Sequence, residues 1–219
     1  VARDLYAYLK HNGVPCKFNV PDVTAFAEGD GDAIPVEVLA ADGAPRYTGT
    51  TIKGVKVAAS PEWLQKKLLS IGLRPINNIV DITNFVLHEI GQPLHAFDAA
   101  KITGGKVVVR RAEEGEKFVT LDGVERTLSA ADLMIANAEK SMCLAGVFGG
   151  EESGVTENTV DVFLESAYFN PVSIRKSSKR HTLKTDASFR YERGADPLVV
   201  EYAAKRAALL IQELAGGQI

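Results

Sequence analysis

The segment Val-Asp-Val-Phe-Leu-Glu-Ser-Ala at residues 160–167 predicts a β-strand, because apolar residues alternate along it with Val160, Val162 and Leu164 on one side. Glu165 interrupts this otherwise apolar strand. A carboxylate in such a position must be paired, exposed at a sheet edge or used in function. The residues alone leave a structural and a functional role for Glu165 open.

The sequence on both sides of this strand mixes strand and helix patterns. Further strands are predicted over residues 35–40, 46–57, 107–109, 117–128, 133–136 and 143–148, and helices over 1–12, 60–72 and 78–90, after 171 and from 196 onward. Ser60-Pro61-Glu62 predicts a helix start with Ser60 as its cap, and Asp122-Gly123 predicts a two-residue hairpin turn. This order of elements favours an α+β architecture over a regular βαβ series.

The composition is that of an ordinary soluble globular protein, with 219 residues, of which 46% are hydrophobic and 24% charged. The formal net charge of -3 gives no overall basic field, so any contact with nucleic acid requires a local patch. Cys16 and Cys143 lie far apart without neighbours at metal-ligand spacing, which favours a reducing cytoplasm over a disulfide framework or a zinc site. No apolar run has membrane-crossing length. The chain begins at Val1 without a methionine and ends at Ile219 shortly after a predicted helix stop. We therefore expect it to be an internal segment of a longer protein.

Common catalytic motifs are absent: the chain has no GxxxxGK[ST] loop, GxSxG elbow, HExxH or paired CxxC. The remaining candidates are Thr83, Asn84, His95, Gly146, Gly149, Gly150 and Glu165. His95 lies in a segment interpreted as a loop after a helix end, where its ring either faces a pocket or makes a structural hydrogen bond. The glycines either let a ligand approach backbone N–H groups or form a tight turn. Thr83 and Asn84 are otherwise ordinary polar residues on a helix surface.

Six basic residues with no acidic residue among them follow Pro171: Arg175, Lys176, Lys179, Arg180, His181 and Lys184. In a net acidic chain they form a local positive patch that suits phosphate. The alternative is a solvated helix face.

Longer motifs are more specific than these signals. They are RPINN (74–78), VDITN (80–84), GQPLHAFD (91–98), TLDG (120–123), LAGVFGG (144–150), PVSIRK (171–176) and FRYERG (189–194). Together, in register over roughly residues 45–197, they resemble the B3/B4 region of the phenylalanyl-tRNA synthetase β subunit. One departure is Ala44, which stands where many relatives have Cys and lies outside the proposed pocket.

The resemblance implies a compact α+β unit whose sheet curves into a half-barrel. It also implies a division into residues 1–20, the tail of a preceding B1-like module, residues 21–197, the B3/B4 editing domain, and residues 198–219, a helix that leads to the next module. The chain itself would carry no cofactor, because ATP and magnesium belong to the aminoacylation site on the α subunit. The implied partners are that α subunit, in a heterotetramer, and the acceptor end of tRNA(Phe), with no membrane.

The function that the resemblance implies is metal-free hydrolysis of the ester in mischarged tyrosyl-tRNA(Phe). The implied pocket is lined by Thr83, Asn84, His95, Gly146, Gly149, Glu165 and Ala167. In this assignment Glu165 accepts the phenol hydroxyl of tyrosine, the two glycines leave room for the ring, and Thr83, Asn84 and His95 lie near the ester. We therefore expect these side chains to share one cavity. The alternative is a non-catalytic scaffold that binds tRNA or another subunit.

Overall fold

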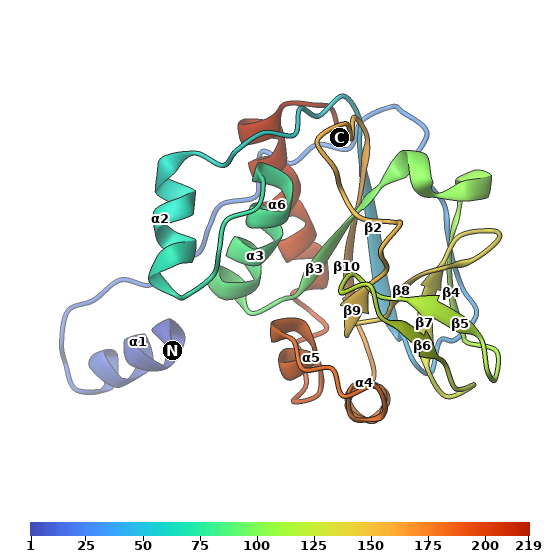
Figure 1. The fold of residues 1–219 in the computed structure, drawn as a ribbon. Coiled ribbons are helices and arrows are strands. Elements are labelled where there is room, and N and C mark those ends of the chain that lie inside the picture. Colours follow the sequence, from blue (N-terminus) through green and yellow to red (C-terminus); the bar gives the residue numbers. More distant parts are fainter.

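The computed structural model describes residues 1–219, which form six α-helices, ten strands and two short 3-10 turns (Figure 1). The helices are α1 (Ala2–His11), α2 (Glu62–Ser70), α3 (Asn78–Ile90), α4 (Pro171–Arg180), α5 (Asp186–Tyr191) and α6 (Val200–Ala215). The strands are β1 (Val36–Val38), β2 (Arg46–Ile52), β3 (Leu94–Asp98), β4 (Val107–Arg111), β5 (Lys117–Val119), β6 (Glu125–Thr127), β7 (Leu133–Ala136), β8 (Ser141–Leu144), β9 (Phe148–Gly149) and β10 (Val162–Tyr168). None of the helices combines the length and the apolar character that a bilayer crossing requires.

The strands form three sheets, with the orders β1-β4-β7-β8-β9, β2-β10-β3 and β5-β6. Only β1 and β4 pair in parallel, and all other pairs are antiparallel. The α+β class is therefore confirmed. The single half-barrel sheet that the resemblance implied is not present, because β10 pairs only with β2 and β3 while the strands from β4 to β9 pair among themselves or with β1.

Strand β10 is the middle strand of the three-stranded sheet, and its two faces belong to different cores. Val162 and Leu164 pack with side chains of α3 and α6 on one face. Phe163 and Ala167 pack on the other face with side chains of the five-stranded sheet. This division follows from the period of two along a strand. Figure 1 shows the same layers, with α2, α3 and α6 on one side of β10 and the larger sheet on the other.

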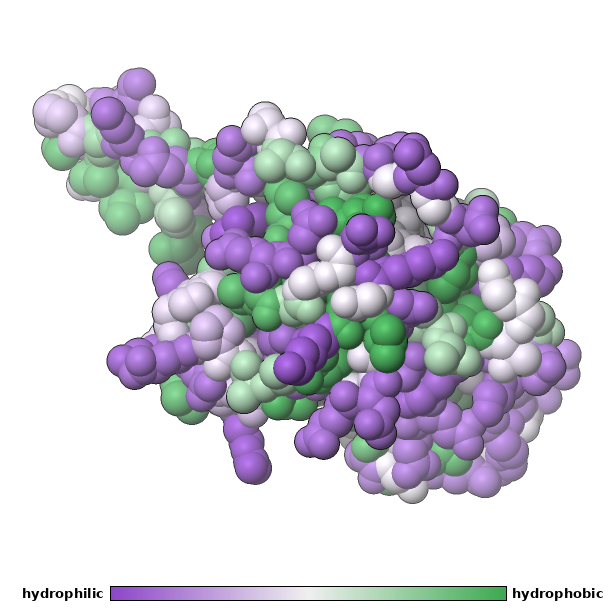
Figure 2. All heavy atoms as spheres, turned by 90° about the horizontal axis from the view of Figure 1, so that it is seen from above, coloured by the Kyte–Doolittle hydropathy of each residue, from purple (hydrophilic) through white to green (hydrophobic).

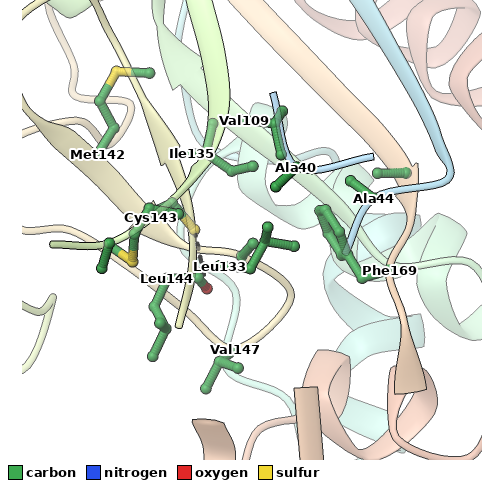
Figure 3. Close-up of a cluster of buried hydrophobic side chains, with 14 of the residues drawn as sticks. Ala40, Ala44, Val109, Leu133, Ile135, Met142, Cys143, Leu144, Val147 and Phe169 are labelled. Carbon is green, nitrogen blue, oxygen red and sulfur yellow. Dashed lines mark hydrogen bonds between the residues drawn. The ribbon is translucent and has the colours of Figure 1, made fainter. Parts of the chain in front are cut away.

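The larger sheet supplies a core of apolar side chains beside the second face of β10 (Figure 3). Leu133 and Ile135 of β7 and Leu144 of β8 are almost completely buried there. They belong to the same cluster of buried side chains as Phe169, which follows β10 directly (Figure 3). The face of β10 that carries Glu165 is therefore enclosed by this sheet.

Helix α3 spans the predicted residues because both of its ends are defined locally. The Asn77 side chain accepts the backbone N–H groups of Ile79 and Val80 and so caps the first turn. Gly91 has φ 93°, the left-handed conformation that commonly follows a helix.

Strand β3 corrects the interpretation of residues 91–98 as a loop. Leu94–Asp98 pair with β10 in antiparallel register, and His95 is the Cα partner of Glu165. The local Gly-Gln-Pro signal predicts only the turn before the strand. Tertiary pairing with an apolar neighbour decides the conformation of the rest.

Three further corrections concern the bounds of elements. Ser60 does not cap α2, because Pro61 occupies the cap position and the Ser60 hydroxyl instead donates to Asp81 at 2.5 Å. Strand β2 ends at Ile52 instead of 57, before a turn at Gly54 with φ 75°. The hairpin between β5 and β6 is closed by a hydrogen bond from the Thr120 N–H to the Val124 carbonyl, so its loop has more than two residues.

Other differences arise where a strand was predicted to continue. A turn at Gly146, with φ 65°, separates β8 from β9 within the predicted strand 143–148. Val160 lies outside β10 and is exposed. Helix α6 begins at Val200, four residues after the predicted start, and the helical region predicted after residue 171 consists of two separate helices, α4 and α5. Ala203, Ala207 and other small residues of α6 pack against α3 in the same core as Leu164.

Helix α1 projects from the remainder of the molecule in both views (Figures 1 and 2). None of its residues is buried, and the apolar side chains Leu5 and Tyr8 are exposed. Figure 2 shows hydrophobic residues on this projecting part. The helix adds nothing to either core.

Candidate functional site

Glu165 lies at the centre of the three-stranded sheet, where Gly49 of β2 and His95 of β3 are its Cα partners. Direct partners in an antiparallel pair point to the same face. Glu165 and His95 therefore both face the core of the larger sheet. The Glu165 residue is only 4% exposed, so the carboxyl group is largely removed from water.

One protein donor contacts this carboxyl group: the Tyr47 hydroxyl donates to Glu165 Oε2 at 2.7 Å. The second oxygen, Oε1, has no hydrogen bond within the chain. Burial raises the pKa of Glu165 to about 7, and the hydrogen bond from Tyr47 limits the rise. A carboxyl group that is buried with a single donor is suited to a ligand that donates a hydrogen bond to its second oxygen.

His95 is the second polar group on this face. Its Nε2 atom is buried and has no hydrogen-bond partner, and its ring stands edge-on to Phe97 with centroids 4.4 Å apart. Burial lowers the pKa of His95 to about 4, so the imidazole is neutral at pH 7. The structural alternative, a hydrogen-bonded histidine, does not hold for Nε2. A neutral ring with an unpaired nitrogen can accept from or donate to a ligand or a water molecule.

The two glycines of the predicted pocket have different surroundings. A Cβ at Gly149 would lie 3.1 Å from His95 Cε1 and 2.8 Å from a Leu121 methyl carbon, so this glycine borders the histidine ring. A Cβ at Gly146 would lie 2.9 Å from the rings of both Phe169 and Tyr191. The space beside Gly146 is therefore filled by aromatic side chains of the protein itself.

Ala167 lies two residues after Glu165 on the same face of β10, and it is fully buried. Its carbonyl accepts from Gln92 Nε2 at 2.8 Å and from the Tyr191 hydroxyl at 3.1 Å. Gln92 Oε1 and His95 Nε2 are the buried side-chain atoms without a partner. Both belong to β3 or to the turn that precedes it, next to β10.

Thr83 and Asn84 lie on α3, whose apolar side chains pack against the opposite face of the sheet. The Thr83 hydroxyl donates to the Val80 carbonyl at 2.7 Å within the helix, and Asn84 is half-buried. No hydrogen bond joins either residue to His95 or Glu165. The structure thus brings together Glu165, His95 and Gly149, whereas a shared cavity with Thr83 and Asn84 stays a prediction.

Two cavities, of about 710 and 470 Å³, lie elsewhere in the molecule. The first is lined by Gly150 and by charged side chains that include Arg110 and Glu116, and the second lies between β2, α6 and residues 26–33. Neither is lined by a residue of the predicted pocket. No group of three or more His, Cys, Asp or Glu side chains is arranged to hold a metal ion.

Sequence reasoning missed three polar groups near Glu165, namely Tyr47, Cys143 and Tyr191, and it also missed Gln92, which contacts Tyr191. Burial and the charge of Glu165 raise the pKa of the Cys143 thiol and of both tyrosine hydroxyls. Gln92 and Tyr191 lie inside the motifs GQPLHAFD and FRYERG, which was the available signal. The chain gave no local sign that Tyr47 reaches Glu165.

Five of the six residues of the basic segment are exposed, namely Arg175, Lys176, Lys179, Arg180 and Lys184, whereas His181 is buried and does not belong to the surface patch. Arg180 forms an ion pair with the buried Asp132, which also accepts from His181 Nε2 at 2.8 Å. The other four cations form no ion pair within the chain. Four unneutralised charges therefore remain on and beside α4.

Comparison with known families gives a match to the B3/4 domain over residues 43–216. The chain belongs to the B3/4 domain family. Its relatives include the phenylalanine–tRNA ligase β subunits of Bacteroides fragilis (60% identical over 220 residues), Porphyromonas gingivalis (56% over 220) and Geobacter metallireducens (48% over 219). Each alignment covers 100% of this chain and 27% of the relative, so the chain spans about a quarter of those subunits.

Among solved structures, the B3/4 chain is similar to an N-terminal fragment of the phenylalanyl-tRNA synthetase β subunit from Pyrococcus horikoshii. The TM-score is 0.48 at 17% identity, covering 70% of this chain and 51% of that one. The recognition from motifs, a β-subunit B3/4 region, is confirmed by the family match and the relatives.

Proposed function

We propose that this B3/4 chain carries an editing site that hydrolyses the ester between tyrosine and the 3′ end of tRNA(Phe). The observation that supports this most strongly is the Glu165 carboxyl group, which is buried and accepts a hydrogen bond from one protein donor at one of its two oxygens. A phenol hydroxyl would supply the second donor.

Tyrosine and phenylalanine differ only in this hydroxyl. How strongly a pocket discriminates between them depends on whether the pocket is apolar or forms a hydrogen bond to the hydroxyl. An apolar pocket cannot strongly reject an analogue that adds a hydroxyl, whereas a pocket built to bond the hydroxyl rejects the analogue without it by roughly 10⁴ to 10⁵. With phenylalanine bound, Glu165 Oε1 would be desolvated without a partner. A site of this kind can therefore remove tyrosine while it spares the correct product.

His95 is the residue that we assign to the ester. Its neutral ring and unpaired Nε2 lie beside Glu165 on the adjacent strand, and Gly149 leaves room next to the ring. We propose that His95, with Asn84 and Thr83, orients the attacking water and the ester carbonyl, without a metal ion or a covalent intermediate. Gly146 and Ala167 would shape the wall of the pocket near the amino acid ring.

The exposed cations Arg175, Lys176, Lys179 and Lys184 are proposed to bind tRNA phosphates, with Arg180 held by Asp132. Because the chain as a whole has a net charge of -3, we expect this patch to support binding only within the complete enzyme. Replacing both Lys176 and Lys179 by Gln should reduce the salt dependence of tRNA binding by roughly one unit of log–log slope for each phosphate that is no longer neutralised. Tight binding of tRNA to the 219-residue chain, independent of salt, would contradict this assignment.

The complete enzyme would be a cytoplasmic phenylalanine–tRNA ligase. Its α subunit would complete a heterotetramer and hold the aminoacylation site with ATP and magnesium. We further propose that residues 1–20 are the tail of a preceding B1-like module, that residues 21–197 form the B3/B4 editing domain, and that residues 198–219 form a helix that leads to the next module. These proposals are supported by the similarity of this chain to proteins that are named as β subunits of phenylalanine–tRNA ligase.

A deacylation assay tests the proposal directly, with tyrosyl-tRNA(Phe) and phenylalanyl-tRNA(Phe) supplied to the complete enzyme and to this chain. The proposal predicts rapid release of tyrosine and little release of phenylalanine by the enzyme. Equal and slow release of both amino acids would favour the alternative, a scaffold that binds tRNA or a subunit. This alternative is favoured by the four exposed cations on and beside α4 that form no ion pair within the chain.

A further inference from the structure

Tyr47 and Glu165 are held in contact by the geometry of the three-stranded sheet. Tyr47 is the Cα partner of Ala167, two residues along β10 from Glu165, so both side chains point to the same face. The Tyr47 ring also packs edge-on against Phe169, with centroids 6.5 Å apart. Packing and strand pairing therefore fix the position of the Tyr47 ring independently of the hydrogen bond that its hydroxyl makes.

The next position of β2 on this face is Gly49, the direct partner of Glu165. A Cβ there would lie 2.4 Å from the Phe163 ring, so this position excludes a side chain. The Phe163 ring occupies the space beside Gly49, and Tyr47 reaches Glu165 diagonally across the two strands.

Other polar groups surround Glu165, but none of them donates to it. The Tyr191 hydroxyl on α5 bonds to the carbonyls of Pro93 and Ala167. The Cys143 thiol on β8 faces the carbonyls of Leu144 and Phe148, and His95 on β3 makes no hydrogen bond through Nε2. Tyr47 is consequently the single group that orients the carboxyl group.

We propose that Tyr47 is a positioning residue for specificity: its hydroxyl occupies Glu165 Oε2 and thereby presents Oε1 to the phenol of a bound tyrosine. This inference rests on the proposed function. A carboxylate has room for several donors, so the two phenols can bind it together, one on each oxygen. Without Tyr47 the carboxyl group could rotate, and neither oxygen would be reserved for the substrate.

Tyr47 also favours the form of Glu165 that can only accept. A hydrogen bond donated to a carboxylate stabilises its ionised state, and the one from Tyr47 partly offsets the effect of burial, so that the pKa of Glu165 is raised to about 7 and no further. Loss of the hydroxyl should therefore protonate Glu165 at neutral pH. A protonated carboxyl group carries its own O–H and is a poorer acceptor for the substrate phenol.

The test is Tyr47→Phe in the complete enzyme, which keeps the ring and removes the donor. Single-turnover deacylation of tyrosyl- and phenylalanyl-tRNA(Phe) would be measured from about pH 6 to about pH 9, a range that brackets the titration of a buried carboxyl group. At neutral pH we expect the preference for tyrosine to fall roughly ten- to hundredfold, as for loss of a hydrogen bond to a charged group. The preference should recover at higher pH, where Glu165 ionises again. Tyr168→Phe is the matched control, because Tyr168 lies on β10 on the face opposite to Glu165, and its hydroxyl makes no hydrogen bond.

An unchanged preference and an unchanged pH midpoint in Tyr47→Phe, with an active wild type, would overturn the inference. Failure of the proposed function looks different, because wild type and Tyr168→Phe would then also fail to release tyrosine. In that case the Glu165 carboxyl signal in a ¹³C-labelled chain still decides the positioning role. Its titration midpoint should rise in Tyr47→Phe, and an unmoved midpoint would refute the role of Tyr47.

Discussion

Two buried carboxyl groups, Asp132 and Glu165, have similar burial but opposite electrostatic settings. Asp132 is 0% exposed and accepts from the Ser129 N–H at 3.0 Å, the Ser177 hydroxyl at 2.6 Å, His181 Nε2 and Arg180. Glu165 is 4% exposed and accepts from a single hydroxyl. Burial alone therefore does not distinguish them.

The number of donors explains the difference. Burial raises the pKa of Asp132, but hydrogen bonds from Ser129, Ser177 and His181 outweigh it and lower the pKa below its ordinary value. For Glu165 the single hydrogen bond is too weak, and the pKa stays raised, at about 7. The hydrogen-bonding capacity of Asp132 is satisfied within the chain, and its contacts with Ser177, Arg180 and His181 fix the C-terminal end of α4. Glu165 is incomplete without a further donor, as expected of a binding site.

The largest expected effect is on selectivity. In the complete enzyme, Glu165→Ala should remove both the bond that selects tyrosine and the desolvation penalty that excludes phenylalanine, narrowing the preference by up to about 10⁴-fold. Single-turnover deacylation of both esters measures this. If Asp132→Asn narrowed the preference as much as Glu165→Ala, the functional distinction between the two carboxyl groups would be wrong.

A comparison of His95 with His181 concerns the rate of hydrolysis. His95 has an unpaired Nε2, whereas His181 is paired with Asp132. His95→Ala should slow tyrosyl-tRNA hydrolysis by about 10² to 10⁴ without admitting phenylalanyl-tRNA, if the ring transfers or positions a proton. His181→Ala should leave the rate of the folded enzyme nearly unchanged and instead lower its stability. A rate loss confined to His181→Ala would reverse the assignment.

Substitution of Asp132 should lower stability more than substitution of Glu165 does, whereas the effect on selectivity should be larger for Glu165. Asp132→Ala leaves several donors without their acceptor and should lower the free energy of unfolding by about 3 kcal/mol or more at pH 7. Since the folded pKa of Asp132 is lowered, its contribution is present above its unfolded value and is lost as pH falls through the folded value. Glu165→Ala leaves only the Tyr47 hydroxyl unpaired and also removes the cost of a buried carboxyl group with a raised pKa, so it should lower that free energy by roughly 1 kcal/mol or less. Urea denaturation of the chain compares them, and equal losses would contradict the account.

The pH dependence of stability gives a finer test, because Glu165 and His95 act in opposite directions. The folded pKa of Glu165, about 7, exceeds its ordinary 4.5, so the folded state keeps a proton longer and stability falls as pH rises between these values. The folded pKa of His95, about 4, is below its ordinary 6.5, so stability rises with pH between 4 and 6.5. Each change amounts to roughly 3 kcal/mol.

In wild type the two slopes should nearly cancel between pH 4.5 and 6.5. Glu165→Gln should expose a rise in stability over that window, and His95→Gln should expose a fall. Denaturant titrations at several pH values measure both slopes. Parallel curves for the two variants would mean that at least one of the buried groups titrates normally in the folded state.

Sequence patterns predicted those parts that depend on local physics. The apolar period and the stop at Gly91 indicated the bounds of α3, and a carboxylate in an apolar strand marked Glu165 as unusual. Strand β3 was missed because its conformation depends on pairing with β10, not on the Gly-Gln-Pro signal before it. Tyr47 was missed because it is 118 residues from Glu165 in the sequence, and only strand pairing brings them together.

Non-hydrolysable 3′-amide analogues of tyrosyl- and phenylalanyl-adenosine would test the central claim, that Glu165 reads the phenol hydroxyl, most directly. Binding to the complete subunit would be followed through the ¹³C signal of the Glu165 carboxyl group. The account predicts that the tyrosyl analogue binds more tightly, shifts this signal and lowers the pKa of Glu165, because a second donor stabilises the carboxylate. Equal binding of both analogues with an unmoved Glu165 signal would contradict it.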